Sequence, residues 1–488
     1  MGISMKKELI TLTALMLASS FAAGCGSGTA DKETDAPDTD KTTTEAESVT
    51  SADYIYPTAD YGGFEFTFLN IEPEIWANVM IAPEEMSGDF VSDAMFERNS
   101  RIEDRYNVVI SDRQVGINDV ANELKKTVTA GDDVYSAAMI SAHTMSGLLG
   151  DNYLCDLKEL DGLNLDKPWW DQMVNESADI MGHLYFTTSD ICLFPFEATV
   201  VLFMNEKTMT DVGLELPYDL VRQGKWTVDR LAEYGKAGAT LNGDESYLPI
   251  AADGSCRYGF GTHFGMIDAF IYGSGGRFAW IEDGKPVFGA DSEKMYGIYE
   301  KVGALASTDG CVLCFEKADG MSDLDAFLRG RAMICSETLG CISNLRDMKD
   351  DYGVIPVPKY DEAQEDYISL LANWGTTLMV VPSSVSDLSR TATILDAMAY
   401  DSHINLMEPY YNAYLMQKGT RNDDSAEMLG IISRTRTLAS DVILGWTSDI
   451  ETALINTLNT GDTAVASKIA ALKDKSIAKI EKDIEKYE

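Results

Sequence analysis

The sequence has 488 residues, of which 45% are hydrophobic and 9% aromatic, so it is long enough for two domains that each have a full hydrophobic core. It has 79 acidic and 39 basic residues, and its formal net charge of −40 repels phosphate backbones and anionic lipid head groups. Nucleic acid is therefore not an expected partner. The charge selects no ligand, because acidity also serves solubility alone.

The N-terminal residues have the composition of a targeting segment. Lys6 and Lys7 form a basic start, and residues 9–21 (LITLTALMLASSF) are apolar. That apolar stretch is long enough for the core of a signal peptide but too short to cross a membrane as a stable anchor.

A cysteine follows this segment in a context that resembles the lipobox of bacterial lipoproteins. Residues 21–25 read FAAGC, with small side chains before Cys25, although Ala22 stands where leucine is most frequent. The resemblance implies that residues 1–24 are removed and that Cys25 carries acyl chains such as palmitate, which anchor the protein on the extracellular face of the cell membrane. The alternative is an ordinary secretory peptide, with Cys25 incidental.

The next segment predicts a tether. Residues 26–52 contain almost no large apolar side chain, so they cannot bury enough surface to offset the entropy of ordering. We expect disorder over residues 25–60, with a mean reach on the order of 30 to 35 Å. No later segment has 18 uninterrupted apolar residues, so no second membrane span is expected.

Strands and helices alternate from residue 61 onward, which favours an α/β architecture with a largely parallel sheet. Ligands of such sheets sit at the carboxyl ends of the strands. The expected strands are residues 64–70, 107–111, 134–140, 199–204, 332–335, 352–356 and 377–381. The expected helices are residues 92–106, 118–130, 229–239, 293–305, 386–400 and 448–487.

Four segments, taken in order, resemble the extracellular solute-binding proteins of bacterial ABC importers, the family that includes maltose-binding protein. No single one is specific, but four in order behind a lipobox and tether are much stronger, and their order and spacing resemble the family across about residues 62–488. The segments are 196–207 (FEATVVLFMNEK), 216–231 with its Leu-Pro and GKWTVDRL, 327–333 (FLRGRAM) and 352–359 (YGVIPVPK).

The resemblance implies a two-lobe periplasmic-binding-protein-like (type II) fold with a hinge and an interlobe cleft. Lobe one would comprise residues 61–196 plus 377–432, and lobe two residues 199–370 plus 440–488. The lobes would close on a ligand, most simply a mono- or oligosaccharide, and present it to ABC permease subunits. No cofactor, catalytic residue or metal ligand is implied.

Aromatic rings and polar side chains at strand ends are the candidate ligand contacts, because sugars need flat apolar faces and hydrogen-bonding groups. Trp446 precedes the long C-terminal helix, where relatives place a stacking aromatic ring; the alternative is a core tryptophan. Trp374 follows Asn373 at an expected crossing between lobes, where hinge packing is equally compatible. Ser141 and His143 follow the third strand, but their loop could simply cap the sheet.

The remaining candidates also follow strands or lie at a crossing. Their structural alternative is local packing. They are Glu337 and Thr338 after the strand at 332–335, His263 before a glycine-rich turn, Glu197 at the first crossing, and Asn70 and Trp76 after the first strand.

Other conspicuous residues are assigned to structure. Trp169, Trp170 and Trp226 are expected in packing, and residues 273–276 (GSGG) lack the lysine of a phosphate-binding loop and predict a turn. Residues 311–314 (CVLC) have the spacing of half a zinc site, but no matching second half exists in the sequence.

Two other classes of function stay open. A glycan-acting enzyme would need two carboxylates facing each other across a cleft, which an acidic chain can supply without a local signature. A surface sensor or adhesin could use the same two-lobe body.

Overall fold

A computed structural model describes residues 54–74, 79–247, 252–313, 321–411, 422–460 and 464–487, all within one compact unit, Thr50–Glu488. Cys25, the expected signal peptide and most of the expected tether lie outside the described residues, and so does Trp76. Across the described ranges, none of the helices is both long and apolar enough to cross a membrane.

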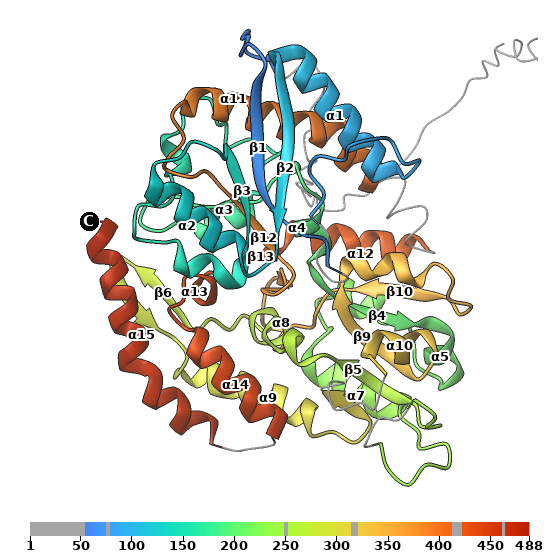
Figure 1. Ribbon diagram of the computed structural model, residues 1–488. Helices are drawn as coiled ribbons and strands as arrows, with labels where there is room; N and C mark the ends of the chain where they lie inside the picture. Colours follow the sequence, from blue (N-terminus) through green and yellow to red (C-terminus); the bar gives the residue numbers. More distant parts are fainter. Residues whose placement is uncertain are drawn as a thin grey trace, which may run out of the picture. The chain divides into compact units, whose positions relative to one another are not determined.

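The first sheet has four strands in the order β12–β3–β1–β2 (Figure 1). The strands β1 (Phe64–Ile71), β2 (Val108–Val115) and β3 (Ala137–Ser141) are parallel, whereas β12 (Thr377–Val380) is antiparallel to β3. Along β1, side chains alternate between more exposed and buried positions as far as Phe68. The residues after Phe68 are all buried, so this part of the strand is covered on both faces. The expected strands of this region are confirmed.

Helices α1 (Phe90–Tyr106) and α11 (Leu388–Ser402) pack on each other beside this sheet, and α2 (Val120–Ala130) packs on β3 and β1 (Figure 1). The Asp89 carboxylate accepts the backbone N–H groups of Val91 and Ser92, which starts α1. The helix ends at Asn107, whose φ of 51° is left-handed.

The second sheet has five strands in the order β10–β4–β9–β5–β8. The strands β5, β8 and β9 are parallel to one another, and β4 runs antiparallel to β9 and β10. Their bounds are β4 (Val200–Asn205), β5 (Tyr258–Thr262), β8 (Cys311–Leu313), β9 (Ala332–Thr338) and β10 (Tyr352–Ile355).

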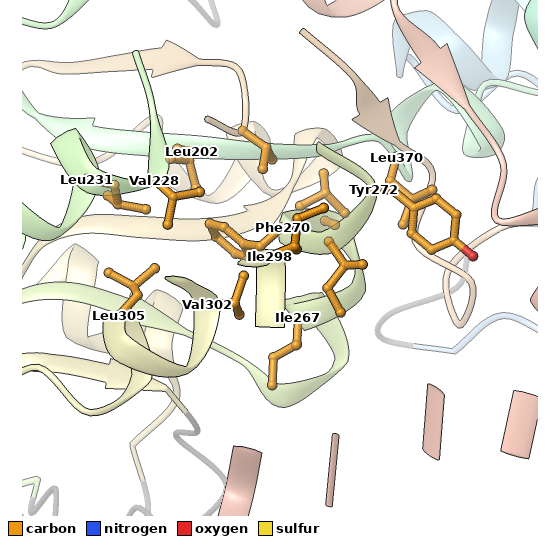
Figure 2. Packing of buried hydrophobic residues seen from close by; sticks show 14 of the residues in the cluster. Leu202, Val228, Leu231, Ile267, Phe270, Tyr272, Ile298, Val302, Leu305 and Leu370 are labelled. Atoms are coloured by element: carbon orange, nitrogen blue, oxygen red, sulfur yellow. The ribbon is translucent and has the colours of Figure 1, made fainter. Parts of the chain in front are cut away.

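Apolar side chains from α7 (Val228–Gly238), α8 (Ile267–Gly273) and α9 (Glu293–Ala306) pack on this sheet, as Figure 2 shows for Leu231, Phe270 and Val302. The expected Trp-Thr helix start is confirmed. The side chain of Thr227 accepts the N–H group of Arg230, and the buried Trp226 indole donates to the carbonyl of Pro356 at 3.1 Å.

A close backbone approach explains one glycine of the second sheet. A Cβ atom on Gly259 of β5 would lie 1.6 Å from the carbonyl oxygen of Gly235 in α7. Any side chain at this position would push the helix off the sheet.

Shorter elements complete the fold. Two small sheets pair β11 (Ser369–Leu370) with β13 (Arg436–Thr437) and β6 (Ala279–Glu282) with β7 (Lys285–Phe288). The remaining helical segments are η1 (Ala142–Gly147), η2 (Leu157–Glu159), α3 (Gln172–Ala178), α4 (Phe194–Glu197), α5 (Glu206–Asp211), α6 (Tyr218–Arg222), η3 (Phe264–Met266), α10 (Asp323–Leu328), η5 (Leu339–Leu345), η6 (His403–Met407), α12 (Asp423–Arg434), α13 (Ser440–Ile443), α14 (Ser448–Thr460) and α15 (Val465–Tyr487).

The C-terminal helix differs from the expectation of one helix over residues 448–487. The structure has two helices there, α14 and α15, which pack on each other. The apolar periodicity continues across the break, but Gly461 directly after α14 has low helix propensity.

The expected end of lobe one at residue 432 also differs from the packing. Helix α12 packs on β10, a strand of the second sheet, and on helix α6, although its place in the chain suggested lobe one. We therefore propose that lobe two includes α12.

The body begins earlier than residue 61, because Tyr54 and Tyr56 pack on the helices of the first sheet. The ring of Tyr54 stacks on Tyr400 of α11 with centroids 4.4 Å apart, and the Arg105 guanidinium lies 3.9 Å from the ring centre of Tyr56. Composition alone assigned residues 54–60 to the tether and missed these rings. We call residues 54–61 the N-terminal strap.

The tryptophans assigned to packing are confirmed there. Trp169 and Trp170 are buried, and both indole N–H groups donate to one oxygen of Asp396 at 2.9 Å.

Candidate ligand-binding site

Backbone hydrogen bonds join the edge of the first sheet to the edge of the second through two crossing segments. The N–H of Ala142, just past β3, donates to the carbonyl of Thr376 at 3.0 Å. The N–H of Ala372 donates to Ala198 at 2.9 Å. The N–H of Leu339, just past β9, donates to the carbonyl of Thr199 at 2.8 Å. The carboxyl ends of β3 and β9 therefore meet at these crossings.

An exposed tryptophan lies where the second crossing reaches the first sheet. Trp374 is 55% exposed, although its type is usually mostly buried. Its ring stacks on the imidazole of His143, with centroids 4.8 Å apart and planes inclined by 24°. The pair offers a flat apolar surface to solvent, which is the shape that covers one face of a sugar ring.

Two polar side chains fix the imidazole of His143. Its Nδ1 lies 2.6 Å from Ser141 Oγ, and its Nε2 lies 3.0 Å from Asn118 Oδ1. Because an amide oxygen only accepts, this network assigns the proton to Nε2 and makes Ser141 the donor to Nδ1. Burial lowers the pKa of His143, so the ring is neutral at neutral pH.

The residue before the exposed tryptophan is tied to two helices. The amide nitrogen of Asn373 donates to Asp268 Oδ2 in α8 and to Glu451 Oε1 in α14, at 3.1 Å in each case. Burial raises the pKa of both carboxyl groups. This junction therefore holds the segment that carries Trp374.

The edge of the second sheet presents buried carboxyl groups. Glu337 Oε2 accepts the N–H of Thr338 at 3.3 Å and the thiol of Cys341 at 3.5 Å. The residue is partly accessible, but its carboxyl group lies deep, and burial followed by the charge of Asp323 raises the pKa of Glu337 to about 8. Burial raises the pKa of Asp323, and the nearby His263 offsets only part of this rise.

The edge residues Glu337, Thr338 and His263 are therefore brought together, as expected from the strand ends. Each lies at the carboxyl end of β9 or directly after β5. Whether they contact a ligand stays a prediction.

Glu197 ends α4 at the first crossing, and its Oε1 accepts the hydroxyl of Tyr410 at 2.5 Å. A Cβ atom on Gly340 would lie 3.2 Å from the Glu197 Cβ, so this side chain packs against the start of η5. Burial raises the pKa of Glu197. The first crossing thus contributes a further carboxyl group next to Gly340.

Two candidates lie away from any exposed surface. Asn70 is fully buried. Its amide nitrogen donates to the carbonyl of Val79 and to Asp112, and its amide oxygen accepts the N–H of Ile71, so its polar atoms bond protein groups around β1. Trp446 is only 4% exposed, and its indole N–H donates to Asp483 Oδ2 at 2.7 Å. We assign both residues to packing, contrary to the expectation from chain position.

Sequence reasoning did not select Asn118, Asp268 or Glu451 as parts of this region. Asn118 precedes a helix and carries no motif, and the two acids sit in helices distant from Asn373 in the chain. Only tertiary packing brings them to His143 and Asn373, the neighbours of Trp374, so no local signal identifies them.

The described residues contain no group of three or more His, Cys, Asp or Glu side chains that could hold a metal. The six described cysteines are free, and Cys314, half of the zinc-like spacing, lies outside the described residues. Within residues 273–276, Gly273 ends α8 and a turn follows at residues 274–275, as expected, with the N–H of Gly275 donating to the carbonyl of Tyr272 at 2.8 Å.

No protein-family model matches the sequence, and no curated protein sequence matches it. Solved structures do match.

An ABC substrate-binding protein from Listeria monocytogenes, in complex with cycloalternan, is 14% identical with a TM-score of 0.55, over 86% of this chain and 98% of that chain. A cyclic α-maltosyl-1,6-maltose binding protein from Arthrobacter globiformis is 12% identical with a TM-score of 0.57, over 86% and 100%. The galacto-N-biose/lacto-N-biose I-binding protein of an ABC transporter from Bifidobacterium longum is 11% identical with a TM-score of 0.58, over 87% and 98%.

At these identities the likeness establishes the architecture. The two mixed sheets, the paired crossings and the nearly complete coverage of each neighbour agree with one another. The chain has the two-lobe fold of the substrate-binding proteins of ABC transporters.

Proposed function

We propose that the protein is an extracellular receptor that captures a carbohydrate between its lobes and delivers it to ABC permease subunits. The observation that carries the proposal is the exposed Trp374, stacked on a neutral and hydrogen-bonded His143, at the crossing where the two sheets meet. An aromatic platform beside uncharged donors and acceptors suits a polyhydroxylated ring.

The comparisons support the class of ligand. The Listeria, Arthrobacter and Bifidobacterium neighbours are named for, or solved with, oligosaccharides. These neighbours are binding proteins, and we propose a binding role without catalysis.

Ligand capture would proceed by lobe closure about the crossings, as in periplasmic binding proteins. The segments at 196–199 and 370–376 are joined by the bridge between Thr199 and Leu371, so they can bend as one ribbon. A ligand that contacts both Trp374 and the Glu337 edge would favour the closed form, because it binds that form more tightly.

Thermal unfolding of the full-length protein in mild detergent tests the ligand class. The panel would contain maltotetraose, a cyclic glucan, lacto-N-biose, a tripeptide and spermidine. A ligand at about 100 times its dissociation constant stabilises the native state by roughly 2.7 kcal/mol, which raises the melting temperature measurably. A rise with glycans alone supports the proposal; a rise only with the peptide or the polyamine would reject the carbohydrate.

Membrane attachment through Cys25 is a separate proposal, based on the lipobox resemblance. Cells fed labelled palmitate should label the wild-type protein and retain it in the membrane fraction. Cys25→Ser should lose both, whereas Cys155→Ser, a thiol of the folded body, should keep both. Unlabelled wild-type protein would contradict the lipid anchor.

A further inference from the structure

Two carboxyl groups converge on one amide nitrogen at the base of the Trp374 segment. Asp268 and Asn373 are 2% and 4% exposed, so bulk water does not separate the groups. The second oxygen of Asp268 accepts the N–H of Ala269 at 2.9 Å. Asp268 Oδ2 and Glu451 Oε1 each lie 3.1 Å from the same amide nitrogen, so the two carboxyl groups are close neighbours, and a proton on one of them would let it donate to the other.

Among the described residues, no cation directly offsets the negative charge of this pair. Asp441 of α13 adds negative charge near Glu451, and it accepts the hydroxyl of Tyr272 at 2.6 Å. The positive charge of Arg277 partly offsets the rise that burial causes in the pKa of Asp441. Helix η3 also packs on α14, and His263 comes directly before η3. The electrostatic effect of His263 is on Asp323, whose pKa it lowers.

Like charges held this close in a buried site cannot both ionise at neutral pH, and such a pair loses its protons in two separated steps. The amide of Asn373 can bond both carboxyl groups at once only while they stay together. Ionisation of both would push them apart and release Asn373. Trp374 is the next residue, so its ring would move with the released segment.

We propose that Asp268 and Glu451 share one proton and that this pair, acting through Asn373, positions the Trp374 platform. These are positioning residues rather than ligand contacts. The platform is then set at low and neutral pH and is lost as rising pH removes the shared proton. The consequence for glycan affinity rests on the proposed function, whereas the shared proton and the position of Trp374 do not.

The first test needs no ligand. The melting temperature of the full-length protein in detergent would be measured from acidic to alkaline pH for wild type, Glu451→Gln and the control Glu481→Gln, which changes an exposed residue of α15. The folded pair binds a proton that the unfolded chain has lost, so wild-type stability falls as pH rises through the pair's titration. The unfolding equilibrium constant should rise by up to about tenfold per pH unit more than in Glu451→Gln.

The control Glu481→Gln should follow wild type. If wild type and Glu451→Gln have parallel profiles, the shared proton is rejected.

The second test reads the platform directly. Subtracting the emission of Trp374→Phe from that of wild type isolates Trp374 from the other six tryptophans. Above about pH 6.5, where the His143 ring is neutral, the Trp374 emission should change with the same midpoint as the stability profile. In the Glu451→Gln background it should stay constant. An emission that ignores pH in wild type would overturn the positioning role.

The third test measures whether the Asp268–Glu451 pair controls ligand affinity. Maltotetraose affinity should fall by up to about tenfold per pH unit above the midpoint in wild type and stay level in Glu451→Gln. Affinity that falls equally in both proteins would overturn the coupling. Failure of every glycan to bind wild type at any pH would count against the proposed function, while the first two tests still decide the proton and the platform.

Discussion

Two of the three tryptophans that chain position marks as candidate ligand contacts lie in opposite environments. Trp374 stands on a crossing segment with more than half of its surface exposed and one stacked neighbour, His143. Trp446 stands on the turn between α13 and α14, almost wholly buried, with its indole N–H bonded to Asp483 of α15.

The difference comes from a residue that is remote in the chain. Asp483 reaches Trp446 because α15 folds back on α14, and the Nζ of Lys479 also donates to the carbonyl of Gly445 at 2.7 Å. Among the described residues, no comparable element covers Trp374. A buried ring affects mainly folding and an exposed ring affects mainly binding, so the two positions should respond to different measurements.

The largest expected effect is on stability. Trp446→Ala should lower the free energy of unfolding by about 3–5 kcal/mol, because it removes a buried aromatic side chain and leaves a cavity. Denaturant unfolding of the full-length protein would measure it. A change within about 0.5 kcal/mol, with weakened maltotetraose binding, would return Trp446 to the ligand site.

The buried side of the comparison extends to Glu337, whose pKa is raised from 4.5 to about 8. The folded state holds this proton over a pH range in which the unfolded chain has lost it, so stability falls as pH rises from about 4.5 to about 8. Glu337→Gln should reduce that slope by up to about 1.4 kcal/mol per pH unit. The exposed-site variant Trp374→Ala should retain the wild-type slope, and an unchanged slope in Glu337→Gln would contradict a raised pKa.

On the exposed side, Trp374→Ala should weaken glycan affinity by about 1 kcal/mol, or roughly fivefold, through loss of the stacking face. Isothermal titration with the glycan that stabilises wild type would measure it. Trp374→Tyr should retain most of the affinity, and the melting temperature of both variants should stay near that of wild type. Equal affinities for Ala and Tyr would remove the platform from the proposed site.

The smallest expected effect concerns the support of the platform. Asn118→Ala removes the acceptor of the His143 Nε2–H, and such a hydrogen bond contributes about 0.5–1.5 kcal/mol. Because the imidazole stays stacked, we expect a two- to threefold loss of glycan affinity at most. A loss larger than that of Trp374→Ala would mean that Asn118 itself contacts the ligand.

Local patterns were sufficient for most of the fold. The alternation of β1, the Trp-Thr start of α7 and the glycine at the end of α2 are each determined by neighbours in the chain. The strap was missed because tyrosines in a polar segment can be assigned only when their partner, Tyr400, is known. The break between α14 and α15 was missed because apolar periodicity continues across it.

The site was only half predictable for the same physical reason. Ser141 ends β3, His143 comes directly after it and Glu337 lies next to the last residue of β9, so the topology rule places them at the carboxyl ends of the strands. The roles of Asp268 and Glu451 depend on helix packing, and the burial of Trp446 depends on a helix that follows it by tens of residues. Exposure is a property of the assembled fold that no local pattern of residues contains.

The N-terminal strap has a mechanical consequence. Tension that reaches Tyr54 along the chain passes into α11 and, through Arg105, into α1, at the end of the first sheet where β1 begins. The crossing segments join the opposite ends of the strands, so this load path bypasses them. A pulling force on the N-terminus should therefore act on the ring contacts of Tyr54 and Tyr56 and not on the crossing segments. Such a force would not oppose the proposed opening and closing of the lobes.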